Sequence, residues 1–134
     1  MFRTDTGFDA EQLAMLGAKA YMMAGGAVAS NEEWPQLDDD AQLAWCSVGD
    51  KTLHRLEGLD GVKFNEVARR IYGWWAASLG KDAADWDKES LEEQVAWEAA
   101  ARHLAWCLNC DEPAEGHDVQ MWEAWAAEQL EKRR

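Results

Sequence analysis

The stretch 86–97 is an imperfect copy of the stretch 34–45, and this internal repeat constrains the fold more than any other feature of the chain. The two stretches lie 52 residues apart throughout their length. The matching pairs are Trp34 and Trp86, Gln42 and Gln94, Leu43 and Val95, Ala44 and Ala96, and Trp45 and Trp97. A repeat of this length predicts a fold that contains two similar structural units.

Both copies have the features of a helix start. Ser90 and Glu93 have the spacing of a capping box, in which the serine oxygen accepts from an early helix amide and the glutamate accepts from the serine amide. In the first copy Asp38 or Asp39 can act as the cap, and the acidic run 38–40 lies where the helix dipole favours negative charge. The tryptophan before each helix is expected to fold back as a buried apolar anchor.

The first copy also carries a pattern that extends beyond the repeat. Its residues are Trp34, Leu37, Gln42, Trp45 and Val48. This spacing resembles the W-x-x-L…Q-x-x-W-x-x-V pattern of short accessory proteins of tailed phages and prophages. The second copy departs from the pattern, because Glu89 stands where the early leucine should be. The resemblance implies a mobile-element origin, with an anti-CRISPR-like role as one expectation, and it implies no defined chemistry.

Length and composition predict a single all-α domain over residues 1–134. A chain of this length can bury a substantial core, and its two prolines and few β-branched residues favour helix over strand. We predict a compact bundle of about five helices, with short connections between neighbours. Its parts are a pseudo-repeat at 9–57, a pseudo-repeat at 62–109 and a terminal helix at 118–132.

Helical periodicity and capping signals define the predicted elements. Asp9 and Gln12 have capping-box spacing, and apolar residues then recur at helical intervals. The predicted helices span 9–29, 39–57, 62–79, 91–109 and 118–132. Gly25 and Gly26 are placed inside the first of them, whereas Gly80 is expected to end the third. Six tryptophans are assigned to the core: Trp34, Trp45, Trp75, Trp86, Trp97 and Trp122.

The chain is strongly and evenly acidic. Its formal charge of −13 divides into −7 over residues 1–67 and −6 over residues 68–134. A folded acidic body repels nucleic acid and anionic membranes and attracts basic surfaces. We therefore expect no direct nucleic-acid or membrane partner. The three cysteines, the absence of an apolar N-terminal signal and the absence of a bilayer-length apolar run predict a reducing cytoplasm. The resemblance to phage proteins implies that this is the cytoplasm of a bacterial host.

Several side chains are candidates for binding a partner. Three of the nine tryptophans fall outside the principal apolar stripes, so they either form a second buried face or lie at an interface. Exposed acids at the two helix starts would supply charge to the same partner. The predicted partner-binding residues are Trp74, Trp106, Trp125, Asp38, Asp39, Asp40, Glu92 and Glu93. The alternative is that all nine tryptophans pack internally.

A group of nitrogen and sulfur donors lies near the end of the fourth predicted helix. His103, Cys107, Cys110 and His117 could converge tetrahedrally on one zinc ion, although their spacing follows no standard zinc-finger pattern. Cys107 also fits a small buried hydrophobe, and His117 also fits a helix start. No cofactor is otherwise implied.

The sequence predicts a binding protein and no enzyme. It contains no Walker loop, no Gly-x-Ser-x-Gly and no His-Glu-x-x-His motif. The first function that we expect is inhibition of a host protein with a basic, nucleic-acid-handling surface, by docking or by DNA mimicry. The alternative is a structural, assembly or immunity-type protein that acts through tryptophan-rich interfaces, including those of a homodimer.

Overall fold

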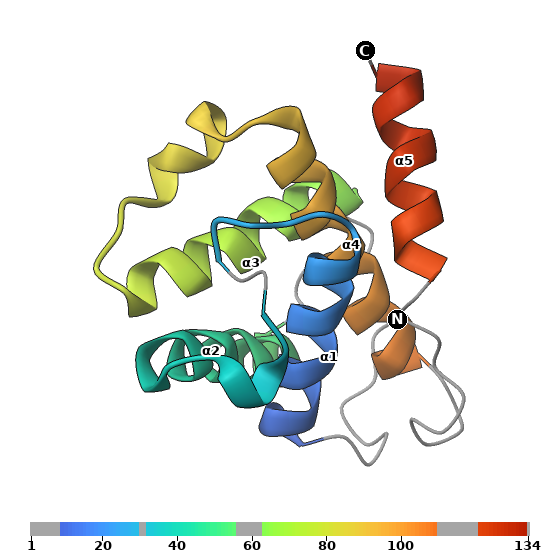
Figure 1. The fold of residues 1–134 in the computed structure, drawn as a ribbon. Coiled ribbons are helices and arrows are strands. Elements are labelled where there is room, and N and C mark those ends of the chain that lie inside the picture. Colours follow the sequence, from blue (N-terminus) through green and yellow to red (C-terminus); the bar gives the residue numbers. More distant parts are fainter. Residues whose placement is uncertain (1–8, 30–31, 56–62, 110–120, 134) are drawn as a thin grey trace.

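Helices make up the regular structure of the chain. The computed structural model describes residues 9–29, 32–55, 63–109 and 121–133 (Figure 1). In chain order the elements are α1 (Ala10–Met23), the 3₁₀ turn η1 (Trp34–Gln36), α2 (Asp39–Arg55), α3 (Phe64–Ser78), the 3₁₀ turn η3 (Ala83–Lys88), α4 (Leu91–Asn109) and α5 (Met121–Arg133). No strand occurs within these ranges, and the prediction of an all-α bundle is confirmed.

The first four α-helices form the body of the bundle. α1 packs against α2 and α4, and α3 packs against the same two helices. Each 3₁₀ turn packs on the helix that precedes it, η1 on α1 and η3 on α3. α5 lies at the side of this body, mainly against α4 (Figure 1). The architecture therefore leaves grooves where a 3₁₀ turn or α5 meets the bundle.

The first helix is shorter than predicted. α1 ends at Met23 because Gly25 adopts a φ of 96°, a left-handed conformation that favours glycine. The amide of Gly26 donates to the carbonyl of Tyr21 at 3.0 Å, which is the closing bond of a Schellman motif. Placing Gly25 and Gly26 inside a helix reaching residue 29 was wrong, since glycine here acts as a stop.

The third helix ends in the same way, as predicted. Gly80 has a φ of 70°, and the amide of Lys81 donates to the carbonyl of Ala76 at 2.8 Å. The predicted capping box at the start of α1 is also confirmed, with Asp9 and Gln12 each accepting from the other's amide. The predicted residues 56–57, 62 and 118–120 lie outside the described part of the chain.

The repeated stretches make the same local contacts. The side-chain amide of Gln42 donates to the carbonyl of Trp34 at 2.9 Å, and that of Gln94 donates to the carbonyl of Trp86 at 3.0 Å. In both copies the tryptophan belongs to a 3₁₀ turn that leads directly into a long helix. Each glutamine thus holds its turn against the start of the following helix.

The structure decides between Asp38 and Asp39 as the N-cap of α2. The carboxylate of Asp38 accepts from the amide of Ala41 at 2.8 Å, so Asp38 is the residue that caps this helix. At the matching position in the second copy, the hydroxyl of Ser90 accepts from the amide of Glu93 at 3.1 Å. Asp39 instead lies in the first turn of α2, where its negative charge faces the positive end of the helix dipole.

Aromatic rings from four helices meet at the centre of the core. Trp97 of α4 stacks on Trp45 of α2, with ring centroids 5.1 Å apart and an interplanar angle of 18°. Tyr21 of α1 and Tyr72 and Trp75 of α3 contact the same ring at centroid distances of 4.8, 5.5 and 5.4 Å. All five side chains are buried. The tyrosines had not been predicted as part of this cluster.

The remaining predicted core tryptophans differ in burial. Trp86 and Trp122 are buried, with 8% and 5% of their surface exposed. Trp34 is only half-buried and packs on the outside of the core. The two repeat tryptophans thus share a backbone position but not an environment, and Trp34 is left accessible at the surface.

Candidate functional site

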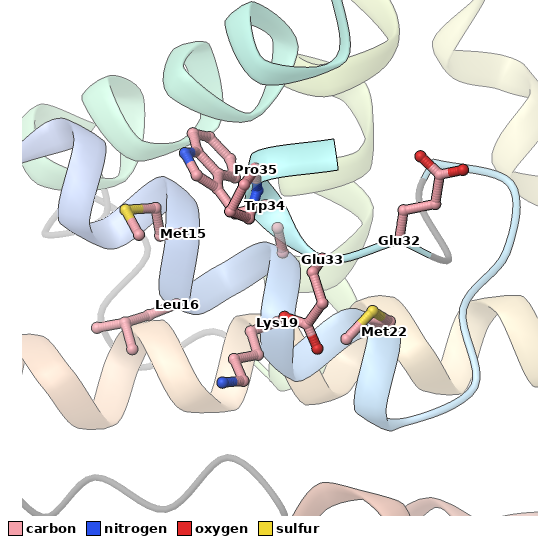
Figure 2. Close-up of a pocket in the computed structure, with 9 residues that line it drawn as sticks. Met15, Leu16, Lys19, Met22, Glu32, Glu33, Trp34 and Pro35 are labelled. Atoms are coloured by element: carbon pink, nitrogen blue, oxygen red, sulfur yellow. The ribbon is translucent and has the colours of Figure 1, made fainter. Parts of the chain in front are cut away.

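An apolar groove lies between α1 and η1. Its volume is about 280 Å³, and Figure 2 shows methionine, leucine and tryptophan side chains bordering it with glutamates at its edge. The lining residues are Met15, Leu16, Ala18, Lys19, Met22, Glu32, Glu33, Trp34 and Pro35. We call it the α1–η1 groove. Its apolar floor and mixed charged edge can receive an apolar side chain of another protein.

Hydrogen bonds to Glu93 and Tyr21 hold the amides of Ala27 and Ala29, which follow α1. Glu93 of α4 accepts from the hydroxyl of Tyr21 and, at 3.2 Å, from the amide of Ala27. The hydroxyl of Tyr21 in turn accepts from the amide of Ala29 at 2.8 Å. The chain after α1 is therefore tied to two helices. Pro35, in the first turn of η1, then restricts the backbone next to Trp34.

The role of Glu93 corrects a prediction. This side chain was expected to contribute charge to a partner, but only 4% of it is exposed. It was also expected to accept from the Ser90 amide in a reciprocal capping box, whereas its carboxylate accepts from Tyr21 and Ala27. Glu93 is therefore an interior residue, and Tyr21 and Ala27 supply the hydrogen-bond donors that its carboxylate needs in place of water.

The edge of the α1–η1 groove is acidic. Glu32 and Glu33 line it, and the exposed run Asp38, Asp39 and Asp40 lies after Leu37, at the start of α2. Lys19 is the cation among the lining residues. In the floor, Met15 has 40% of its surface exposed. The lining of the groove thus combines apolar side chains with two acids and one lysine.

A second groove brings together two of the predicted interface tryptophans. We call it the α4–α5 groove; it has a volume of about 450 Å³ and is lined by Phe64, Arg102, Ala105, Trp106, Met121, Trp122 and Trp125. Trp106 and Met121 are 41% and 47% exposed. Trp125 packs edge-on against the buried Trp122, with centroids 5.2 Å apart. This groove is a second candidate for protein binding.

Trp74 lies apart from the other two predicted interface tryptophans. It is half-buried on α3 and lines a surface depression with Glu66, Arg69 and Arg70. Glu92 is exposed in the first turn of α4. The three predicted interface tryptophans therefore line two different depressions.

The predicted zinc ligands are only partly within the described residues. His103 and Cys107 are buried on α4, whereas Cys110 and His117 lie outside the described part. The Nδ1 atom of His103 accepts from the indole nitrogen of Trp122 at 3.1 Å, so this atom is committed to α5. Within the described ranges there is no group of three or more His, Cys, Asp or Glu side chains that could hold a metal. Zinc binding through all four residues stays a prediction.

Burial raises the pKa values of two side chains, Cys46 and Tyr72. Burial, and secondarily the charge of Glu11, raises the pKa of the Cys46 thiol, which disfavours the nucleophilic thiolate. Burial, followed by the hydrogen bond to Glu89 at 3.1 Å, raises the pKa of the Tyr72 phenol. Both shifts keep these groups neutral.

Comparison with known proteins returned no match to a family model, to a curated protein or to a solved structure. In the described part of the chain, each helix is too short or too polar to span a lipid bilayer. The assignment of function therefore rests on the grooves themselves.

Proposed function

We propose that this chain is a non-enzymatic acidic binding protein, encoded by a mobile element, that inhibits a bacterial host protein by docking on its basic surface. The observation that carries the proposal is the α1–η1 groove, which combines an apolar floor with an edge that bears Glu32 and Glu33. The sequence pattern beginning at Trp34, with its resemblance to phage accessory proteins, supports the mobile-element origin.

The floor of the α1–η1 groove supplies the short-range attraction. Met15, Met22 and Trp34 line it, and methionine adapts its shape to irregular apolar surfaces. Burial of an inserted side chain contributes about 25 cal/mol for each Å² of apolar surface removed from water, before the entropic cost of association is subtracted. The groove therefore acts as the anchor of the interface.

The charge supplies long-range attraction. A net charge of −13 accelerates encounter with a basic surface, and acids beside the groove fix the orientation of the partner. Asp38, Asp39 and Asp40 extend this charge along the chain from the groove edge. A partner surface that normally binds nucleic acid has the complementary charge, and its occupation would block that binding.

Affinity capture from a bacterial lysate with matched variants tests the proposal. The groove variant is Glu32→Lys/Glu33→Lys, and the control is Glu123→Lys/Glu131→Lys, which makes the same charge change at exposed positions of α5. We expect a basic host protein to be retained by the wild type and the control and lost by the groove variant. Retention of the same proteins by all three baits would contradict the proposal.

The α4–α5 groove supports a second candidate function, a structural or assembly protein that associates through tryptophan-rich faces. The supporting observation is that Trp106 and Met121 expose large apolar surfaces next to each other in one groove. In this case sedimentation would show a concentration-dependent mass. Trp106→Ser should abolish the dependence, whereas Glu32→Lys/Glu33→Lys should leave it unchanged.

A further inference from the structure

A buried carboxylate holds two arginines at the junction of α4 and α5. Glu98 has a side chain that is only 6% exposed, and it accepts from Arg102 at 3.1 Å and from Arg133 at 2.9 Å. A second bond from each arginine, at 3.3 and 3.2 Å, completes the network. One carboxylate thus faces two guanidinium groups, so the network retains an excess positive charge.

Arg102 is held in one orientation by aromatic rings as well. Its guanidinium carbon lies 4.5 Å from the ring centroid of Phe64 and 5.3 Å from that of Trp125. A guanidinium carries five N–H donors, and the bonds to Glu98 engage only its Nε and Nη2 atoms. A fixed guanidinium loses little freedom on binding a second anion.

The two arginines border an open cleft with a third cation. This Arg102 cleft has a volume of about 440 Å³ and is lined by Lys63, Phe64, Asn65, Glu98, Arg102 and Arg133. Lys63 is exposed and precedes the first turn of α3, whose amides add partial positive charge. Three cationic side chains face one carboxylate, which makes the cleft locally positive on an acidic protein.

The Arg102 cleft and the α4–α5 groove are adjacent. Both are lined by Phe64 and Arg102, and the groove continues with Trp106, Met121 and Trp125. A ligand that fits both must carry an anionic group beside an apolar body. The flat donor fork of arginine matches the geometry of a carboxylate.

We propose that the Arg102 cleft binds a carboxylate of an acidic, apolar peptide segment of a partner protein, with the apolar side chains of that segment in the α4–α5 groove. This site differs in position and in sign of charge from the α1–η1 groove, so it does not depend on the function proposed above. It gives the protein a second docking surface, for an acidic partner.

Calorimetric titration with two synthetic peptides tests the site. One probe is a blocked peptide of alternating leucine and aspartate, and the other replaces each aspartate by asparagine. At physiological salt the Debye length is about 8 Å, so repulsion from distant acids is largely screened. We expect the aspartate peptide to bind the wild-type protein about tenfold more tightly than the asparagine peptide. Equal affinities, or no binding of the aspartate peptide, would overturn the proposal.

Single substitutions test whether the aspartate peptide binds in the Arg102 cleft. Lys63→Gln should weaken binding of the aspartate peptide about fivefold, since it removes one partly solvated charge pair. Lys88→Gln, at a side chain that is 82% exposed on η3, is the matched control and should leave the affinity unchanged. Arg102→Lys keeps the charge but removes the fork, and should weaken binding about tenfold. If this variant fails to fold in a thermal melt, Lys63→Gln decides alone; equal effects of Lys63→Gln and Lys88→Gln would overturn the assignment.

Discussion

Trp97 is the residue on which the packing of the bundle depends most. Its ring contacts aromatic side chains from α1, α2 and α3, and it is fully buried. Aromatic pairs contribute about 0.5–1.5 kcal/mol beyond the burial of their area, so several contacts to one ring add substantially to stability. Trp34 makes a different contribution, because it is half-buried beside the α1–η1 groove.

Alanine substitution should separate these two tryptophans. Trp97→Ala is expected to lower the free energy of unfolding by about 3–5 kcal/mol, the range for emptying a large buried aromatic site. Trp34→Ala should cost about 1–2 kcal/mol, since less apolar surface is lost. Urea unfolding followed by circular dichroism measures both values. Equal costs would mean that Trp34 is a core residue and that the groove is not accessible.

Tyr72 should make stability depend on alkaline pH. Burial first, and then the hydrogen bond to Glu89, raises the pKa of its phenol, so the folded state favours the protonated form. The stabilisation is present below the ordinary tyrosine pKa of about 10 and is lost as pH rises through the higher folded-state value. Denaturation midpoints should therefore fall more steeply above about pH 10 for the wild type than for Tyr72→Phe. Parallel curves for the two proteins would contradict this.

The helices illustrate what local sequence determines. Asp9 and Ser90 each cap a helix start through one short-range hydrogen bond, and both could be predicted from spacing alone. At α2 the sequence left Asp38 and Asp39 as alternatives, and the hydrogen bond from Ala41 identifies Asp38 as the cap. The end of α1 could not be recognised with the same ease. Gly25 follows an apolar run that fits a longer helix. The left-handed turn at Gly25 is required because the amide of Ala27 bonds to Glu93, a residue distant in the sequence.

The candidate site was predicted less completely than the helices. Trp106 and Trp125 were selected because they fall outside the apolar stripes, and they do share a groove. The α1–η1 groove was missed, since its shape depends on how residues 26–29 are held by Tyr21 and Glu93 from distant parts of the chain. The burial of Glu93 could not be predicted either. Glu92 and Glu93 are identical neighbours in the sequence, but only Glu93 is buried.

Gly73, inside α3, and Gly80, just after its end, should respond in opposite ways to substitution by alanine. Gly80→Ala is expected to destabilise the protein by about 1–2 kcal/mol, because its φ of 70° is left-handed and no neighbouring atom is close enough to add a clash. Gly73→Ala should stabilise it by about 0.4–1 kcal/mol, since the added methyl would meet Ala83 at an ordinary 3.6 Å. Thermal melts of both variants provide the comparison. Destabilisation by Gly73→Ala would show that this face of α3 is more tightly packed.

On the scale of the whole molecule, the acidic bundle carries surfaces of unlike chemistry. The α1–η1 groove joins an apolar floor to acids, and the Arg102 cleft joins two arginines and a lysine to an aromatic groove. The net charge of −13 acts at long range, whereas each groove acts only on contact. We propose that the acidic groove between α1 and η1 selects the main partner.

Selection by the acidic groove can be measured as the salt dependence of the association rate with a captured basic host protein. Between about 0.05 M and about 0.3 M salt we expect the association rate constant to fall at least about tenfold, with the dissociation rate nearly unchanged, because screening weakens electrostatic steering. Glu32→Lys/Glu33→Lys should slow association at low salt. An association rate indifferent to salt, together with rapid dissociation on loss of Trp106 or Trp125, would contradict the claim and favour an assembly protein that binds through the α4–α5 groove.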